Sequence, residues 1–285
     1  MSTQKPLNPD NTDQEQAMQT DVLLIYPYFY THAPKAMLFH PLGIAQLAAV
    51  LRGYGLRIRI IDCTFENRDG VIAKITHARP RIVGIYVMLS MSENAMGLAG
   101  AIRQALPETL LTCGGPLPTL KPDIFTTVFD AVFRGESHAS FPDFCRDYIE
   151  SNSTPLNLSG FVRNPETYPG IYFNKPQNKT VSKSASRPSD KKTFDLFPIP
   201  DRGDYDHLKY QQFWSDRKDP SLASIMTSYG CPFDCDFCSK PVFGNRLRLR
   251  DMDKIFEEIR DIKNLGYDGL WIADDCFSLD PEHTR

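Results

Sequence analysis

The feature that most constrains the fold of this chain is an alternation of short apolar runs with amphipathic segments between residues 21 and 150. Five apolar runs predict buried strands: DVLLIYP, LRIRIID, RIVGIYVML, TLLTCGG and FDAVFRG. Apolar residues at helical spacing mark two of the segments between them: Ile44, Leu47, Ala48 and Leu51, then Ala95, Ala99, Ile102 and Leu106. Strands that alternate with single helices predict an α/β fold, a Rossmann or flavodoxin-like parallel sheet with helices on both faces.

The predicted topology also predicts where function lies. In open parallel sheets, ligands bind in the crevice outside the carboxyl ends of the strands. We therefore expect the loops that follow Tyr28, Leu89, Gly115 and Gly135 to carry functional residues.

The rest of the chain divides into three further parts. Residues 1–20 are polar and predict a disordered arm, and residues 151–215 are rich in Ser, Pro, Asn and Lys and predict a connector with one exposed hairpin at GIYFNKPQNKTVSK and an extended LFPIPDR segment. Residues 216–285 predict a strand, a helix capped by Asp251 and a second strand, GLWIADD. We expect these to be the first β/α units of a TIM-like barrel. Because a strand, a helix and a strand cannot close a barrel, we expect an incomplete domain.

Charge and hydropathy exclude several classes of partner. The net charge of −3 gives no basic excess for nucleic acid, and no apolar run reaches the roughly 18 residues that a membrane helix needs. Seven cysteines, three of them within eight positions, do not suit a secreted disulfide framework. These features favour a cytoplasmic protein that binds neither nucleic acid nor a membrane.

The sequence CPFDCDFC places Cys231, Cys235 and Cys238 in one loop after a strand. Three thiolates bind three irons of a cubane 4Fe-4S cluster and leave the fourth iron without a protein ligand. A zinc site is the alternative, with Cys276 or a histidine as fourth ligand, because structural zinc usually takes four ligands.

The spacing of these cysteines resembles the radical SAM signature. In that family the open iron chelates S-adenosyl-L-methionine (SAM), and cleavage of SAM yields a 5′-deoxyadenosyl radical. The resemblance implies that Phe237, before the third cysteine, packs against adenine, and that Asp274 and Asp275, at the end of the second strand, contact the methionine moiety. The alternative for the aspartates is that one of them caps the next element.

Residues 21–150 resemble a cobalamin-binding module. The stretch LFHPLG has its histidine and glycine where that module has them, with Leu38 where an aspartate usually orients the imidazole. The resemblance implies a cobalamin site at His40, Gly43, Ser90, Ser92, Gly114, Gly115, Gly135 and Glu136, with His40 as candidate cobalt ligand. We expect the paired glycines to permit close approach of the corrin. A generic flavodoxin-like domain is the alternative.

The order of the parts resembles the cobalamin-binding radical SAM enzymes. This resemblance implies a methyltransferase that acts on an unactivated carbon or phosphorus centre of a small molecule, fed by an electron donor such as flavodoxin or ferredoxin. A radical cyclase of the anaerobic chlorophyll-pathway type and a cobalamin-binding fragment without turnover are the alternatives. The substrate is expected between the two domains.

Overall fold

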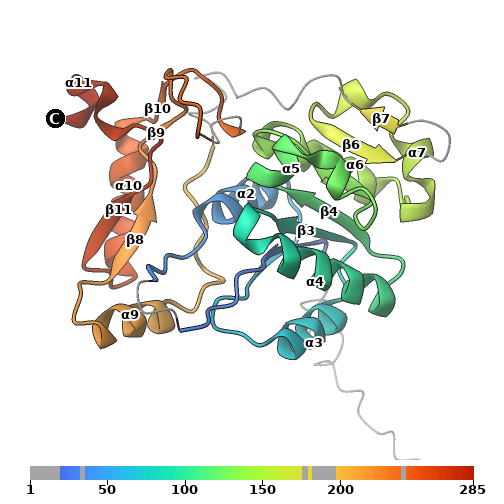
Figure 1. Ribbon diagram of the computed structural model, residues 1–285, viewed down its shortest axis with the longest axis horizontal. Helices are drawn as coiled ribbons and strands as arrows, with labels where there is room; N and C mark the ends of the chain where they lie inside the picture. Colours follow the sequence, from blue (N-terminus) through green and yellow to red (C-terminus); the bar gives the residue numbers. More distant parts are fainter. Residues whose placement is uncertain (1–19, 33–35, 175–178, 182–196, 239–241) are drawn as a thin grey trace, which may run out of the picture.

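A computed structural model describes residues 20–32, 36–174, 179–181, 197–238 and 242–285. Its largest element is a seven-stranded sheet in the order β2-β1-β3-β4-β5-β6-β7 (Figure 1). The predicted strands are all present, as β1 (Val22–Tyr26), β2 (Ile58–Asp62), β3 (Ile82–Tyr86), β4 (Leu110–Gly114) and β5 (Ala131–Phe133), and they pair in parallel. The predicted α/β fold is confirmed.

Helices cover both faces of this sheet because its strands are apolar on both sides. Val22 and Leu24 of β1 face one core with α2 (Leu42–Gly53) and α6 (Phe141–Glu150), while Leu23 and Ile25 face a second core with α3 (Arg68–Ala78) and α4 (Ser92–Ala105). The short helix α5 (Pro116–Leu120) follows β4. The two cores fix the carboxyl ends of the strands at one edge of the sheet.

The predicted hairpin is present, and it continues the sheet. β6 (Ile171–Asn174) pairs antiparallel with β5, and β7 (Lys179–Val181) pairs antiparallel with β6. Ile171 and Phe173 lie in the same core as α6, together with residues of the one-turn helix α7 (Leu158–Phe161). The sequence indicated an exposed hairpin, whereas its first strand, β6, is buried. β6 covers the edge of β5, which would otherwise have unpaired backbone groups.

The second structural unit contains β8 (Leu222–Ile225), β9 (Ser228–Tyr229), β10 (Arg248–Leu249), α10 (Met252–Asn264), β11 (Gly269–Ile272) and the short α11 (Pro281–Thr284). β8 and β11 pair in parallel, and β9 and β10 pair antiparallel. The Asp251 carboxylate accepts hydrogen bonds from the backbone N–H groups of Asp253 and Lys254, so the predicted N-cap of α10 is confirmed.

The connector runs between the two units and includes a helix that the sequence did not predict, α9 (His207–Asp216). Tyr210 and Trp214 of α9 are buried, and the Trp214 indole donates to the Leu38 carbonyl at 3.1 Å. Figure 1 shows α9 at one end of the second unit, beside the first unit. Residues 1–19 of the predicted disordered arm lie outside the described residues. No helix among the described residues is long and apolar enough to cross a membrane.

Candidate functional site

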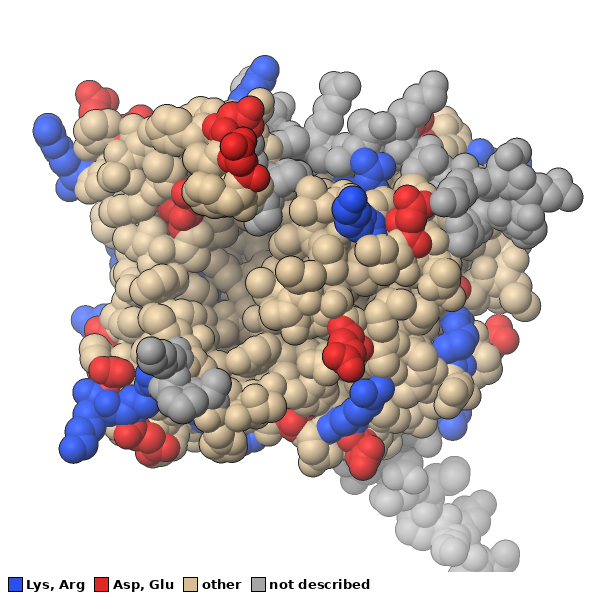
Figure 2. Space-filling view, in the orientation of Figure 1, with Lys and Arg blue, Asp and Glu red and all other residues tan. Residues whose placement is uncertain are grey.

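A cavity of about 660 Å³ lies between the carboxyl edge of the large sheet and the second unit. It is visible in Figure 2 as a hollow between the two halves of the molecule, with a mostly uncharged floor. Residues that follow β1, β3, β4 and β5 line one side, and residues of β8, the cysteine loop and the segment after β11 line the other. The strand order places the cavity at the switch between β1 and β3, where parallel α/β sheets bind ligands.

The structure brings most of the predicted cobalamin residues to this cavity. Its lining includes His40, Gly43, Ser90, Gly114, Gly115, Gly135 and Glu136. The exception is Ser92, which begins α4 and donates its hydroxyl hydrogen to the Leu89 carbonyl at 2.9 Å. Three tyrosines that are not among the predicted cobalamin residues, Tyr26, Tyr28 and Tyr86, also line the cavity.

Backbone angles and close contacts within the protein account for some of the predicted glycines. Gly115 has φ +114°, and a Cβ there would lie 2.7 Å from the Val87 carbonyl oxygen, so this position requires glycine before any ligand is considered. Gly135 has φ +80° and donates its N–H to the Thr119 hydroxyl at 3.0 Å. A Cβ added at Gly43, in contrast, would meet no protein atom within 4 Å. The cavity beside α2 therefore has space to hold a ligand.

His40 is buried in an aromatic cluster. Its ring stacks on Tyr205 with centroids 5.5 Å apart and lies edge-on to the rings of His207, Tyr210 and Tyr267. Both ring nitrogens are inaccessible to solvent and have no hydrogen-bond partner among the described residues. Burial, and then the positive charge of Arg202, holds the pKa of His40 well below its ordinary value, which favours the neutral imidazole.

His138 is a cavity residue that sequence reasoning missed. It follows Glu136 by two residues, its ring nitrogens are buried without a partner among the described residues, and its ring lies 5.4 Å from that of Phe197. Burial, and then Arg248, lowers the pKa of His138 to about 4. The sequence pointed to the glycine and glutamate of this turn. Nothing in the local sequence marks the histidine that follows them as a buried imidazole.

The base of the cysteine loop is closed by backbone contacts. Gly230 has φ +79°, and a Cβ there would run into the Arg246 carbonyl oxygen. The Cys231 N–H donates to the Gly244 carbonyl at 3.4 Å. This geometry explains why glycine precedes the first cysteine.

The three cysteine thiols are free of disulfides. Cys231 is half-buried, Cys235 and Cys238 are exposed, and Cys238 lines the cavity. Among the described residues, no three His, Cys, Asp or Glu side chains are gathered as a metal site. The loop supplies three cysteine thiolates within eight positions. These three groups would have to come together around a cluster when it binds.

The two aspartates at the end of β11 face different partners. The Asp274 carboxylate accepts hydrogen bonds from the Thr227 N–H and hydroxyl, both at 2.6 Å, and from the Ser228 hydroxyl at 2.7 Å. Asp275 lines the cavity and accepts a hydrogen bond from the Gly230 N–H at 3.0 Å. Asp274 thus fixes the strand before the cysteine loop, and Asp275 lies where a ligand in the cavity can reach it. Phe237 is 92% exposed in this arrangement.

Comparisons with known proteins match both units. Residues 35–144 match the B12 binding domain family. An uncharacterized methyltransferase of Pyrococcus horikoshii is 29% identical over 86% of this chain and 50% of that protein. Cytidylyl-2-hydroxyethylphosphonate methyltransferase of Streptomyces wedmorensis is 25% identical over 86% and 53% of the two chains. Anaerobic magnesium-protoporphyrin IX monomethyl ester cyclase of Rubrivivax gelatinosus is 26% identical over 89% and 44%.

The chain spans about half the length of these curated relatives. Among solved structures, the radical S-adenosylmethionine methyltransferase TsrM from Kitasatospora setae is similar with a TM-score of 0.73, over 92% of this chain and 49% of that chain. At 19% identity, this likeness shows a shared fold.

These matches confirm the predicted resemblance of the chain to the cobalamin-binding radical SAM enzymes. The match at residues 35–144 covers all eight predicted cobalamin residues. The unit that matches the B12 binding domain forms one wall of the cavity, and the unit with the cysteine loop forms the other.

Proposed function

We propose that the chain is the cobalamin- and SAM-binding part of a radical SAM methyltransferase that acts on an unactivated carbon or phosphorus centre of a small molecule. One observation carries this proposal. Residues of the B12-binding unit and of the cysteine loop, among them Gly43, Ser90, Cys238 and Asp275, line a single cavity. Two cofactors bound from opposite walls would face the same space, as transfer of a group between them requires.

Cysteines 231, 235 and 238 are the proposed ligands of a 4Fe-4S cluster. When bound, the cluster, SAM and cobalamin would supply a 5′-deoxyadenosyl radical and a methyl group. The chain's part is to hold and separate these groups. Asp275 offers a carboxylate at the cavity for the amino group of SAM, while Asp274 keeps the strand before the loop in place. Phe237, exposed beside Cys238, is the proposed adenine contact.

The cobalamin site is proposed at the predicted residues that line the cavity, which are His40, Gly43, Ser90, Gly114, Gly115, Gly135 and Glu136, and Ser92 is left out. The space at Gly43 and the apolar lining of the cavity suit a large ligand with a hydrophobic rim. For His40 the geometry favours a supporting role, because its two nitrogens lie among aromatic rings. Met88, Met91 and Phe141 line the cavity and would keep water from the reacting centre.

The similarity to a magnesium-protoporphyrin ester cyclase supports a second candidate, a radical cyclase with the same cofactors. Product analysis separates the two. Methylation releases both S-adenosylhomocysteine and 5′-deoxyadenosine, whereas cyclisation releases 5′-deoxyadenosine without S-adenosylhomocysteine. Cobalamin binding with no cleavage of SAM under reducing conditions would contradict both and leave a cobalamin carrier or sensor.

Reduction of the cluster requires a partner. We propose an electron donor such as flavodoxin or ferredoxin, and a cytoplasmic location where such donors and reduced thiols coexist. Exposed Cys235 and Cys238 lie at the surface where a donor can approach. Reduction of the reconstituted cluster by flavodoxin, followed by its visible spectrum, tests this partner, and no reduction by flavodoxin or ferredoxin would contradict it.

A further inference from the structure

One buried arginine joins both ends of the cysteine loop. Arg248 lies on β10, directly after the loop, and pairs in antiparallel register with Tyr229 of β9, directly before it. Its Nη2 donates to the Phe243 carbonyl at 3.2 Å, near the end of the loop. Its guanidinium lies over the Tyr229 ring, 5.8 Å from the centroid. The position of Arg248 therefore sets the position of the loop.

The same arginine contacts the B12-binding unit. Nη1 of Arg248 lies 2.9 Å from Oε2 of Glu136, and the two side chains are 8% and 1% exposed. Glu136 follows β5 and lines the cavity, so this ion pair crosses from the large sheet to the base of the cysteine loop. Separation of a buried ion pair leaves each charge without its partner in a site with little water, so the two side chains are held together.

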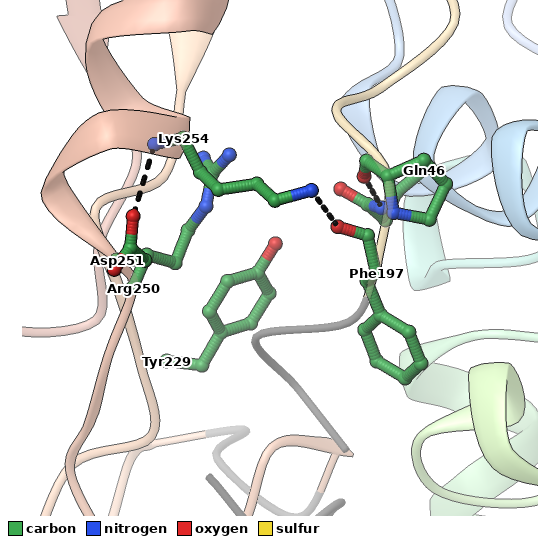
Figure 3. A pocket seen from close by; sticks show the side chains of 7 residues that line it. Gln46, Phe197, Tyr229, Arg250, Asp251 and Lys254 are labelled. Atoms are coloured by element: carbon green, nitrogen blue, oxygen red, sulfur yellow. Dashed lines mark hydrogen bonds between the residues drawn. The ribbon is translucent and has the colours of Figure 1, made fainter. Parts of the chain in front are cut away.

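A second set of contacts between the two units lies beside the ion pair. In Figure 3, Gln46 reaches from α2 and Lys254 from α10 toward neighbouring carbonyls of the connector. Gln46 Nε2 donates to the Pro198 carbonyl at 2.5 Å, and Lys254 Nζ donates to the Phe197 carbonyl at 3.4 Å. The space among these groups and the Tyr229 ring measures about 10 Å³, which is room for one water molecule. This region is a packed joint between the units.

We propose that Glu136 and Arg248 are positioning residues for the reaction between the two cofactors. Their ion pair holds the base of the cysteine loop at a fixed distance from the cavity, so that a cluster on Cys231, Cys235 and Cys238 faces the corrin in one geometry. The inference rests on the proposed function. It assigns Glu136 a partner within the chain and gives Arg248 a role that its place outside the cysteine motif does not suggest.

The test compares Arg248→Gln and Glu136→Gln with the unchanged 285-residue chain, each reconstituted with iron, sulfide and cobalamin. The readout is the relaxation enhancement that cob(II)alamin imposes on the reduced cluster, from power saturation of the cluster's electron paramagnetic resonance (EPR) signal, relative to protein that holds diamagnetic methylcobalamin. This enhancement falls steeply with distance, so it reports the separation of the cofactors. If the pair only stabilised the fold, the relaxation enhancement would be unchanged in the folded fraction of each variant.

The expected result is a loss of enhancement in both single variants and no further loss in Arg248→Gln/Glu136→Gln, because either change removes the same ion pair. Cobalamin affinity of Arg248→Gln should equal that of the unchanged chain. Arg248→Lys keeps the charge and should restore part of the enhancement. Arg103→Gln is the matched control, since Arg103 pairs with Asp130 at 2.6 Å within the first unit and also donates to backbone carbonyls.

Unchanged enhancement in Arg248→Gln would overturn the inference. A weakened cobalamin affinity in Glu136→Gln beside that result would leave Glu136 with a cobalamin contact alone and no positioning role. If the unchanged chain shows cluster and cobalt signals, these outcomes leave the proposed function standing. If it shows neither signal, both proposals fail together.

Discussion

Arg202 of the connector and Glu258 of α10 form an ion pair, with 2.5 Å between Nη2 and Oε1, in a place where the two side chains are 3% and 0% exposed. Arg250 pairs with the other carboxylate oxygen of Glu258 at 2.6 Å. Both arginines also donate to backbone carbonyls before the cysteine loop, Arg202 to Ser224 in β8 and Arg250 to Met226 directly after β8. One buried carboxylate thus joins the connector, α10 and β8.

Replacement of Glu258 by alanine should destabilise the chain strongly. It leaves Arg202 and Arg250 buried without their anion, and removal of one partner from a buried pair costs about 3–5 kcal/mol. Urea denaturation followed by tryptophan fluorescence measures the free energy of unfolding. Glu66→Ala is the control, because its pair with Lys74 is largely exposed and should contribute less than about 1 kcal/mol. Equal losses in the two variants would contradict this account of the Glu258 site.

Replacement of Cys235 by alanine should abolish the iron–sulfur cluster and all cleavage of SAM, because three thiolates are needed to hold three irons. Iron content, the visible spectrum and 5′-deoxyadenosine formation measure the loss. Cys276→Ala is the control: Cys276 lies outside the loop and should be dispensable. Either of two results would favour the zinc alternative. One is retention of the cluster in Cys235→Ala, and the other is bound zinc in the unchanged chain that is lost in Cys276→Ala.

His138 should make the fold sensitive to acid. Its pKa is lowered from 6.5 to about 4, so between these values the unfolded chain binds a proton that the folded chain does not. The contribution of His138 to the free energy of unfolding is fully present above pH 6.5 and is lost as the pH falls toward 4. One pKa unit corresponds to about 1.4 kcal/mol, so the full loss is about 3 kcal/mol.

His138→Gln should therefore flatten the dependence of the unfolding free energy on pH across this window. His77→Gln is the control, because His77 is exposed on α3. Urea denaturation at several pH values measures both variants. An unchanged slope in His138→Gln would show that the imidazole titrates normally in the folded chain.

His40 should not ligate cobalt. Its nitrogens are covered by the aromatic cluster, so coordination would require the ring to leave its stack with Tyr205. The EPR spectrum of the chain with cob(II)inamide, which lacks the nucleotide base, should show no nitrogen splitting. Splitting that disappears in His40→Phe would make His40 the axial ligand.

The sequence predicted the large sheet because β1, β3, β4 and β5 are short runs of mainly apolar residues, the pattern of strands buried on both faces, while β2 alternates and leaves Arg59 exposed. It did not predict α9, because Tyr210 and Trp214 are embedded in a polar connector and the signal is short. An N-cap at Asp206, whose carboxylate accepts from the Lys209 N–H, marks the start of that helix. The four-residue spacing of Asp206, Tyr210 and Trp214 is a helical signal that the prediction did not use.

The candidate site was predicted in part. Loops after parallel strands were expected at the cavity, and their glycines and Glu136 lie there. Asp274 and Asp275 were expected to act together at SAM, whereas Asp274 accepts hydrogen bonds from Thr227 and Ser228 and Asp275 accepts one from Gly230 at the cavity. Pairs distant in the chain, such as Glu136 with Arg248 and Arg202 with Glu258, leave no pattern in a single sequence.

The most direct test of the central claim is an anaerobic EPR spectrum of the chain reconstituted with iron, sulfide and cobalamin, recorded with and without SAM. The account predicts a reduced-cluster signal that shifts when SAM is added, beside a cobalt(II) signal. A cobalt signal with no SAM-responsive cluster, or neither signal, would contradict the claim that both cofactors occupy this cavity.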